Sequence, residues 1–359
     1  MVLMDIQPGN PSVDIRTARD IADEPTVLLF YQEYEADKFI PGDRYLKRVL
    51  RPAYNLLHHR QKKTGFAVSF ELLCAALRAS GCRVRINDYR CARANPHYPV
   101  GIVGFPIILE RWSLPNPALL GPSLYDHPGL APHLFDDNRF KKYVVLADWT
   151  YDLFFPYFGE RCIKWFAGID LAEWPDLSTC EKPYDFLIYD KVRWDHDELQ
   201  ASLIDPICRM LEARGLTSQI VRYGFHDHDT YRRMLSESRS VLFLCEHETQ
   251  GIAYQEALAS GAPVLAWDNG FWLDPLWQRF HCTAPAASSV PFFSHSCGER
   301  FASIAEFAPA LERFLAGHAS YDSRGYVRQH LSPAASARIY QDAYFSLLLD
   351  APHRVHPRL

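Results

Sequence analysis

The stretch SVLFLCEHETQGIAYQEALASGAPVLAW, residues 240–267, predicts a strand, a helix and a second strand in succession. Its first six residues are apolar apart from Ser240, which is typical of a strand buried on both faces of a sheet. The helix is expected to begin near Gly251, and the next strand follows as APVLAW. Strands that alternate with helices are usually parallel neighbours, so the stretch predicts an α/β domain with a parallel sheet.

The same alternation continues in both directions along the chain. Upstream, we expect strands at TVLLFY, CRVRIN, VGIVGF and KKYVVLA, and a helix at FAVSFELLCAALRAS that stops at Gly81. A polar stretch follows over residues 159–186, and the alternation then restarts with YDFLIY and SQIVRYG. Because 359 residues are too many for one ordinary core, two domains are expected.

Composition and charge exclude several classes of function. The formal net charge is −5, without the basic excess that neutralises phosphate backbones, so nucleic acid is not an expected partner. Residues 1–25 lack the apolar core of a signal peptide, and no apolar run reaches the ~18 residues of a spanning helix. The nine cysteines are scattered without a Cys-x-x-Cys pair, which fits free thiols in a reducing cytoplasm. We therefore expect a cytoplasmic protein without a transmembrane segment, in which peripheral membrane contact remains possible.

Glu248 and Glu256 define a candidate site within the opening stretch. In a doubly wound domain, ligands bind beyond the carboxyl ends of the strands, at the loops that enter the next helices. Glu248 lies in such a loop, and Glu256 lies about one and a half turns into the helix. Between them, the free N–H groups of the helix start offer an anion site that Gly251 lets a phosphate approach. The alternative interpretation is a helix-capping Glu248 and a solvated Glu256.

The segment ETQGIAYQEALASGAPVLAW resembles the retaining GT-B glycosyltransferases of the large family 4, or group 1, type. Their pattern is Glu-Gly-Phe-Gly, four more residues, Glu-Ala-Met-Ala, then Gly-x-Pro-Val and a hydrophobic strand. Upstream, GIDLAEWP at residues 168–175 is similar to the Gly-Val-Asp, four-residue, Pro segment of the interdomain linker in that family. The matching residues of the main motif are Glu248, Gly251, Glu256, Ala257, Ala259, Gly261, Pro263 and Val264.

The resemblance implies an α/β protein of GT-B architecture, with two Rossmann-like domains that face each other across a cleft. The implied parts are an acceptor-side domain at 1–170, a linker at 171–183, a nucleotide-sugar-binding domain at 184–332 and a C-terminal helix at 333–359 that crosses back to the first domain. The implied reaction moves a sugar from a nucleotide diphosphate donor, most readily a UDP- or GDP-sugar, to a glycan, lipid-linked or small-molecule acceptor, with retention of configuration. A nucleotide-sugar-binding protein without catalysis and a GT-B epimerase or inverting transferase stay open as alternatives.

The resemblance also implies a role for each residue of the motif. Glu256 would hold the ribose hydroxyls of the nucleotide, and Glu248 would bind the donor sugar beside its reacting carbon. Neither a cofactor nor a metal ion is expected, because cationic side chains and helix N–H groups would hold the diphosphate. The loop and helix start supply the other donor-binding residues: Thr249, Gln250, Gly251 and Ile252.

The chain departs from the family pattern where cations are needed. LIYDKVRWDHDE, residues 187–198, places Lys191 roughly where the family has an arginine, and Arg193 lies two residues beyond. We predict that both bind the diphosphate and act in catalysis. The alternative for each cation is a salt bridge within the same segment, with Asp190, Asp195 or Asp197.

Three further segments carry weaker signals. Gly65, in HHRQKKTGF, is predicted to bring a helix start to the donor, with a solvated basic loop as the alternative. His127, in GPSLYDHPG, is the candidate for a cleft histidine that contacts the donor sugar, with a structural role as the alternative. HDHD at 226–229 is interpreted as a helix cap and not as a metal site. WDNGFW at 267–272 could border the nucleotide base. The long connection after the first strand is expected to be partly helical and near the cleft.

Overall fold

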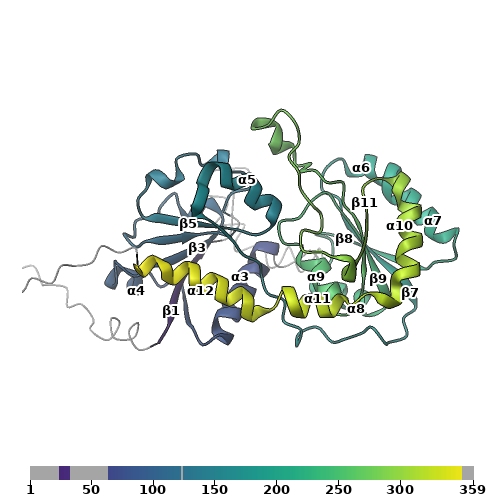
Figure 1. Ribbon diagram of the computed structural model, residues 1–359, viewed down its shortest axis with the longest axis horizontal. Coiled ribbons are helices and arrows are strands. Elements are labelled where there is room, and N and C mark those ends of the chain that lie inside the picture. The colour runs from purple at the N-terminus through teal and green to yellow at the C-terminus, as the bar shows by residue number, and fades with distance from the viewer. Residues whose placement is uncertain (1–23, 33–63, 123, 350–359) are drawn as a thin grey trace, which may run out of the picture.

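The computed structural model describes residues 24–32, 64–122 and 124–349, which form two α/β lobes (Figure 1). The greater part of the long connection after the first strand, residues 33–63, lies outside this described part. No helix among the described residues is both long enough and apolar enough to cross a lipid bilayer.

The N-terminal lobe is built on a six-stranded parallel sheet in the order β2-β1-β3-β4-β5-β6. Its strands are β1 (Thr26–Gln32), β2 (Arg83–Ile86), β3 (Val100–Gly104), β4 (Ala118–Leu120), β5 (Phe140–Val145) and β6 (Cys162–Lys164). The helices of this part of the chain are α3 (Gly65–Ala79), α4 (Tyr89–Ala94) and α5 (Asp148–Phe158).

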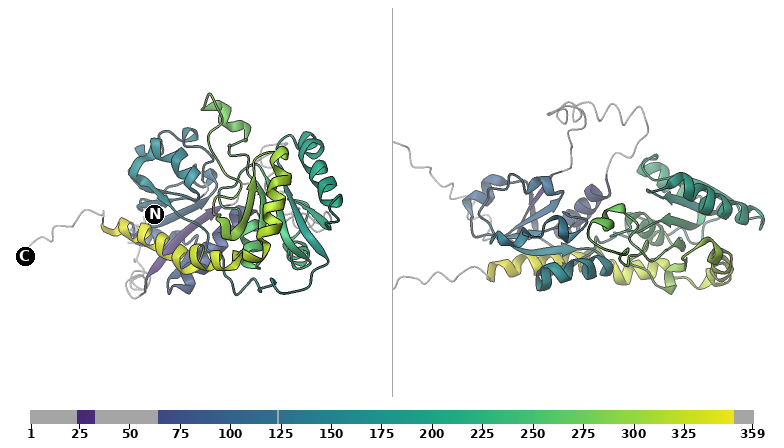
Figure 2. Two further views of the ribbon diagram at one scale, coloured as in Figure 1. Left: turned by 45° about the vertical axis from the view of Figure 1, so that its right-hand side comes forward. Right: turned by 90° about the horizontal axis from the view of Figure 1, so that it is seen from above.

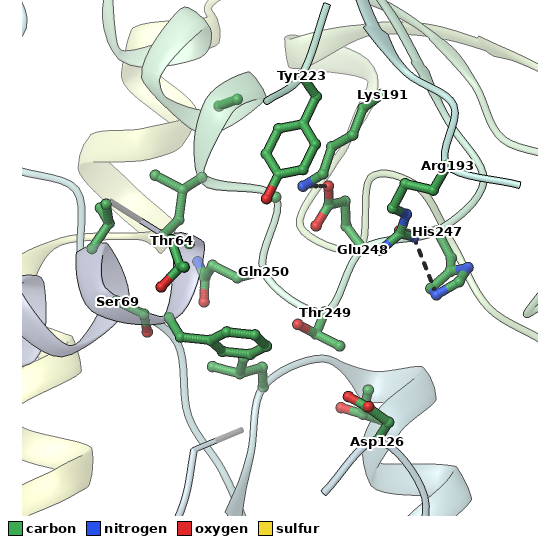
Figure 3. A pocket seen from close by; sticks show the side chains of 18 of the residues that line it. Thr64, Ser69, Asp126, Lys191, Arg193, Tyr223, His247, Glu248, Thr249 and Gln250 are labelled. Atoms are coloured by element: carbon green, nitrogen blue, oxygen red, sulfur yellow. Dashed lines mark hydrogen bonds and ion pairs between the residues drawn. The ribbon is translucent and has the colours of Figure 1, made fainter. Parts of the chain in front are cut away.

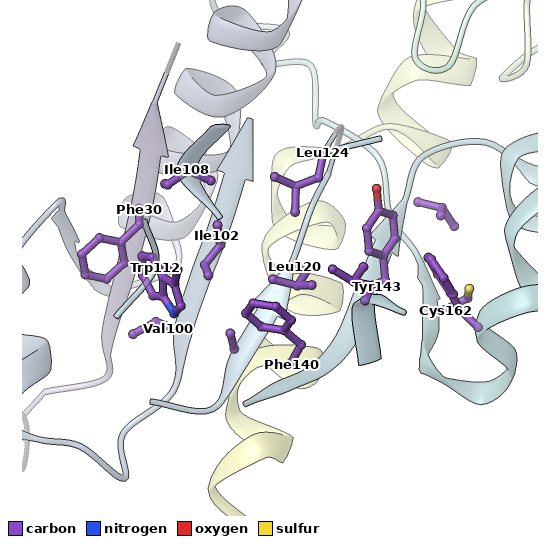
Figure 4. Packing of buried hydrophobic residues seen from close by; sticks show 14 of the residues in the cluster. Phe30, Val100, Ile102, Ile108, Trp112, Leu120, Leu124, Phe140, Tyr143 and Cys162 are labelled. Carbon is purple, nitrogen blue, oxygen red and sulfur yellow. The ribbon is translucent and has the colours of Figure 1, made fainter. Parts of the chain in front are cut away.

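Both faces of this sheet are covered, which explains why β1 is a continuous apolar run and does not alternate with polar residues. Val27 and Leu29 belong to the core under α3 and the last helix, α12 (Pro333–Leu349). Leu28 and Phe30 belong to the core on the opposite side, which Figure 4 shows together with Trp112 and the other large side chains of that layer. The sheet is thus packed between two hydrophobic cores.

The C-terminal lobe is built on a five-stranded parallel sheet in the order β11-β10-β9-β7-β8. Its strands are β7 (Tyr184–Lys191), β8 (Ser218–Arg222), β9 (Ser238–Cys245), β10 (Val264–Trp267) and β11 (Gly298–Phe301). Its helices are α6 (His196–Leu199), α7 (Asp205–Glu212), α8 (His228–Ser236), α9 (Ile252–Ala259), α10 (Ile304–Gly317) and α11 (Ser323–His330). The strand, helix and strand predicted within residues 240–267 are confirmed as β9, α9 and β10.

The chain passes between the lobes twice, and the two crossings touch. The outgoing segment, residues 165–183, contains no strand. A Cβ on Gly168 would lie 2.5 Å from the Cα of Pro333 on the returning segment, so this close approach requires glycine. The Trp165 indole donates to the Ser336 carbonyl at 2.9 Å, which ties the start of α12 to the same segment. Seen from above, α11 and α12 run along one side of the two lobes (Figure 2).

Candidate functional site

A cavity of about 480 Å³ lies between the two lobes. Its C-terminal wall comes from the loops after β7, β8 and β9 and from the start of α9, and its N-terminal wall includes the start of α3 and the residues after β4 and β5. Parallel sheets place their ligand sites beyond the carboxyl ends of their strands, and both lobes turn that edge toward this cavity. Figure 3 shows the side chains that meet there.

An ion pair between Lys191 and Glu248 lies in the C-terminal wall. Lys191 ends β7 and is the register partner of Cys245, the last residue of β9, so the loop after β9 brings Glu248 to it. The two side chains are 15% and 10% exposed. Burial is the largest single influence and lowers the pKa of Lys191, but the charge and hydrogen bond of Glu248, together with Cys245 and Tyr223, raise the pKa above its ordinary value. Lys191 therefore carries its charge into the cavity.

Arg193 is the second cation of the cavity, and buried Glu246 holds the loop on which it stands. One carboxylate oxygen of Glu246 accepts the backbone N–H groups of Arg193 and Trp194 at 2.7 and 3.0 Å. The Arg193 guanidinium donates to the His247 carbonyl at 2.7 Å, and its Nε lies 3.7 Å from the other Glu246 oxygen. Both predicted cations thus pair with glutamates of the loop after β9, and Asp190, an alternative partner, pairs instead with His196 at 2.8 Å.

His247 is a site residue that the sequence did not single out. Its ring stacks on Trp194 with centroids 5.2 Å apart and lies edge-on to Trp149 and Trp272. Burial, together with the positive charges of Arg193 and Lys191, lowers the pKa of His247 to about 2. The ring is therefore neutral, and it adds an apolar wall beside Arg193 without competing for anions.

The start of α9, where the sequence predicts an anion site, lines the cavity. Gly251 has φ +75°, and a Cβ at this position would collide with the ring of Tyr254, so only glycine fits. Within the described part of the chain, the N–H groups of Gly251 and Ile252 have no hydrogen-bond acceptor. Thr249 also lines the cavity, whereas the Gln250 side chain exchanges hydrogen bonds with the backbone of Ala167 at 2.9 and 3.3 Å. Only the backbone of Gln250 is thus left to meet a ligand.

Glu256 lines the cavity from the first turns of α9, and its side chain is mostly buried. His228, the first residue of α8, places its Nε2 atom 3.3 Å from one Glu256 oxygen. Burial raises the pKa of Glu256, and the hydrogen bond and charge of His228 oppose that rise. The alternative interpretation of the motif is excluded, because Glu256 is not a solvated residue and α9 has no side-chain cap from Glu248.

The N-terminal wall places Gly65 at the cavity and His127 away from it. Gly65 is the first residue of α3 and lines the cavity beside its N-cap, Thr64. His127 is fully buried and does not line the cavity. Its Nδ1 accepts the Gly129 N–H at 2.9 Å, and its Nε2 lies 2.8 Å from Nε2 of His281 in the other lobe.

The surroundings of His127 fit its structural alternative. The ring stacks on Phe280 with centroids 4.0 Å apart, and burial together with His281 lowers the pKa of His127 to about 4. A neutral ring whose two nitrogens are engaged joins the lobes, and it does not line the cavity. The neighbouring Tyr125 and Asp126 line the cavity in its place.

Several other outcomes concern segments outside the main motif. Asp227 accepts the Thr230 N–H at 2.8 Å as the N-cap of α8, so the capping interpretation of HDHD is confirmed. Within the described residues, no group of three or more potential metal ligands comes together. Of WDNGFW, Trp272 lines the cavity. Tyr223 also lines it, and the Lys191 ammonium lies 4.5 Å from the centroid of the Tyr223 ring.

Comparison with known proteins identifies the fold. No protein-family model matches the chain, and a search of curated proteins also found no match. Among solved structures, AviGT4, a glycosyltransferase involved in avilamycin A biosynthesis, aligns at 13% identity over 90% of this chain and 99% of that one, with a TM-score of 0.56. Sucrose-phosphate synthase from Thermosynechococcus elongatus aligns at 11% identity over 91% of this chain and 100% of that one, with a TM-score of 0.55. An alpha-glucosyltransferase in complex with UDP and a 13-mer DNA aligns at 10% identity over 91% of this chain and 100% of its own, with a TM-score of 0.51.

At these identities the likeness concerns the fold. The chain has the GT-B architecture predicted from its sequence, two Rossmann-like domains that face each other across a cleft.

Proposed function

We propose that this protein is a glycosyltransferase that moves a sugar from a nucleoside diphosphate donor to an acceptor hydroxyl, with retention of configuration. The observation that carries the proposal is the composition of one cavity wall. It contains a buried cation beside a carboxylate (Lys191 and Glu248), a second cation (Arg193), a helix start with free N–H groups, and the mostly buried carboxylate of Glu256. A diphosphate flanked by two sugars needs these groups in this combination.

The chemistry follows from where charge develops during transfer. As the glycosidic bond breaks, negative charge grows on the departing diphosphate and positive charge grows on the sugar ring. Lys191, Arg193 and the N–H groups at the start of α9 would stabilise the diphosphate, and Glu248 would face the ring. Because the Lys191–Glu248 pair already holds opposite charges side by side before a ligand arrives, little reorganisation is needed at the moment of reaction.

The N-terminal wall would receive the acceptor. Among the described residues, it presents mostly aromatic and aliphatic side chains to the cavity, including Phe66, Phe105, Trp149 and Phe154, with the carboxylate of Asp126 among them. Such a wall suits a glycan that stacks on rings or an acceptor with an apolar body. The choice among glycan, lipid-linked and small-molecule acceptors stays a prediction, as does a cytoplasmic location.

A thermal-shift panel of UDP, GDP, ADP and their sugars tests donor binding. A ligand that binds only the folded state raises the melting temperature, by the equivalent of about 2.7 kcal/mol at one hundred times its dissociation constant. We expect one nucleotide series to produce this rise, equally with and without EDTA, because side chains and helix N–H groups replace a metal ion. A rise that required manganese would contradict metal-independent binding, and no rise with any nucleotide would contradict the proposed donor.

Hydrolysis of the donor sugar in the absence of an acceptor then separates a transferase from a pure binding protein. We expect slow release of the free sugar with the nucleotide-sugar that binds, because a site that activates the donor transfers some of it to water. Binding without any hydrolysis or transfer would favour the alternative of a nucleotide-sugar-binding protein. The anomeric configuration of the product distinguishes retention from inversion.

A further inference from the structure

His228 contacts the predicted ribose-binding carboxylate from a neighbouring helix. It is the first residue of α8, its side chain lines the cavity, and its Nε2 lies 3.3 Å from Oε1 of Glu256 on α9. On its other side the His228 ring lies edge-on to Trp174, with centroids 5.6 Å apart. Trp174 belongs to the buried part of the interdomain segment, and the Arg232 guanidinium lies 4.4 Å from its ring centroid. The imidazole is therefore held between a fixed aromatic ring and the carboxylate.

We propose that His228 is a positioning residue for the donor nucleotide, which holds the Glu256 carboxylate through Oε1 and orients it toward the ribose. The inference rests on the proposed function, because it requires a nucleotide whose ribose reaches Glu256. His228 contacts Oε1, so Oε2 stays available to accept from the vicinal hydroxyls of a ribose. A neutral carboxylic acid would offer fewer acceptor positions to those hydroxyls.

The charge balance at Glu256 supports this role. Burial in the cavity wall raises the pKa of Glu256, and the hydrogen bond from His228 is the largest influence that lowers it again. The pKa of His228 itself is raised, first by its hydrogen bond to Glu256, while burial works in the opposite direction. The other charged groups that act on His228 are Arg232, which lowers its pKa, and Asp229, which raises it.

The direction in which removal of His228 changes the pH dependence of nucleotide binding can therefore be predicted. Without the imidazole, the pKa of Glu256 rises further, so the carboxylate becomes protonated at a higher pH than in the wild type. As the pH is lowered, nucleotide affinity should therefore begin to fall at a higher pH than in the wild type. We call this falling part of the affinity profile the acid limb. A residue that only supported the fold would weaken binding at every pH alike and would leave this acid limb where it was.

Isothermal titration of the full-length chain with UDP, GDP and ADP tests the inference, between pH 5 and 8.5. For the nucleotide that binds, we expect His228→Ala to weaken affinity roughly five- to tenfold at pH 7, since it removes a partly exposed hydrogen bond to a charged group. We also expect the acid limb to move to higher pH, because the pKa of Glu256 rises without the hydrogen bond from His228. His228→Gln keeps a donor without the charge, so its affinity should lie between those of wild type and His228→Ala.

Two controls make the result specific. His133→Ala removes a histidine–carboxylate contact of 3.1 Å to Asp136 outside the cavity, and it should change neither affinity nor pH profile. The 2′,3′-dideoxy form of the same nucleotide lacks the ribose hydroxyls, so its affinity should be the same for wild type and His228→Ala. Suppose that wild type binds UDP, GDP or ADP. If His228→Ala then binds the same nucleotide equally at every pH, or loses affinity without a shift of the acid limb, the inference about His228 is overturned and the proposed function is not. If wild type binds none of the three, the proposed function and the inference are overturned together.

Discussion

Replacement of Glu248 by glutamine is expected to destabilise the protein, because it leaves the Lys191 ammonium without a charged partner. The two side chains are only 10% and 15% exposed, so water screens their attraction little. Loss of one partner of a buried ion pair costs about 3–5 kcal/mol. Glutamine keeps the shape and one acceptor oxygen, so we expect a smaller loss of about 1–3 kcal/mol. For domains of this size, that loss lowers the melting temperature by roughly 2–12 °C.

The pH dependence of this loss has a definite sign. In the wild type the pKa of Lys191 is raised, so the pair stabilises the fold at neutral pH and loses this effect only as pH rises through that raised pKa. In Glu248→Gln, burial acts without Glu248 and lowers the pKa of Lys191 below its ordinary value. The variant then sheds the buried charge as the pH rises toward that ordinary value and regains stability. The difference between variant and wild type should therefore be larger at pH 7 than at pH 9.5.

Urea denaturation at both pH values measures the effect, with Glu312→Gln as the matched control. Glu312 pairs with Arg214 at 3.1 Å on the surface, where its side chain is 66% exposed, so its loss should change the unfolding free energy by less than about 1 kcal/mol. Equal stability of Glu248→Gln and wild type at pH 7 would refute the reasoning. A difference that grew with pH would refute it as well.

Two other substitutions test separate parts of the site. In steady-state kinetics with the donor that binds, Glu256→Gln should raise the donor KM more than it lowers kcat, whereas Glu248→Gln should lower kcat by about ten- to a thousandfold at nearly constant KM. A change in KM alone for both variants would make Glu248 a binding residue only. Gly251→Ala must place a side chain at φ +75° against the Tyr254 ring, so thermal melts should show a loss of at least about 1 kcal/mol and a smaller nucleotide-induced rise. A normal rise in a fully stable Gly251→Ala protein would contradict the close packing at the start of α9.

The sequence predicts the parts of the site that depend on local pattern. A buried strand followed by a glycine and a helix places Gly251 and Glu256 at the edge of a parallel sheet, whatever the rest of the chain does. The pairing of Lys191 with Glu248, 57 residues further along the chain, cannot be predicted in this way, because it depends on the register between β7 and β9. Only their order along the chain and the resemblance to a known motif suggested that the two residues share a site.

The histidines show most clearly which features of the site cannot be predicted from the sequence. A histidine in a loop can turn toward a cavity or toward a core, and the local sequence is the same in both cases. His127 turns inward because Phe280 and His281, in the other lobe, cover it. His228 and His247 turn toward the cavity because carboxylates and aromatic rings from distant segments surround them there. Such contacts are decided by the packing of segments that lie far apart in the chain, which no local pattern encodes.

That packing also fixes the loop that carries Glu248. The Trp149 indole, from the N-terminal lobe, donates to the Glu248 carbonyl at 2.8 Å, and the Glu248 N–H donates to the Ser288 carbonyl at 2.9 Å. Two residues further along, the Gln250 side chain binds the backbone of Ala167 in the interdomain segment. The loop is thus bound to both lobes and to the connection between them, so any change in the angle between the lobes must act on the Glu248 backbone. Lys191 and Glu248 both belong to the C-terminal lobe, so a change in the angle between the lobes acts on their ion pair only through the bonds to Trp149 and Ala167. A reaction that depends on charges arranged in advance needs the Glu248 backbone to be held at both of these points.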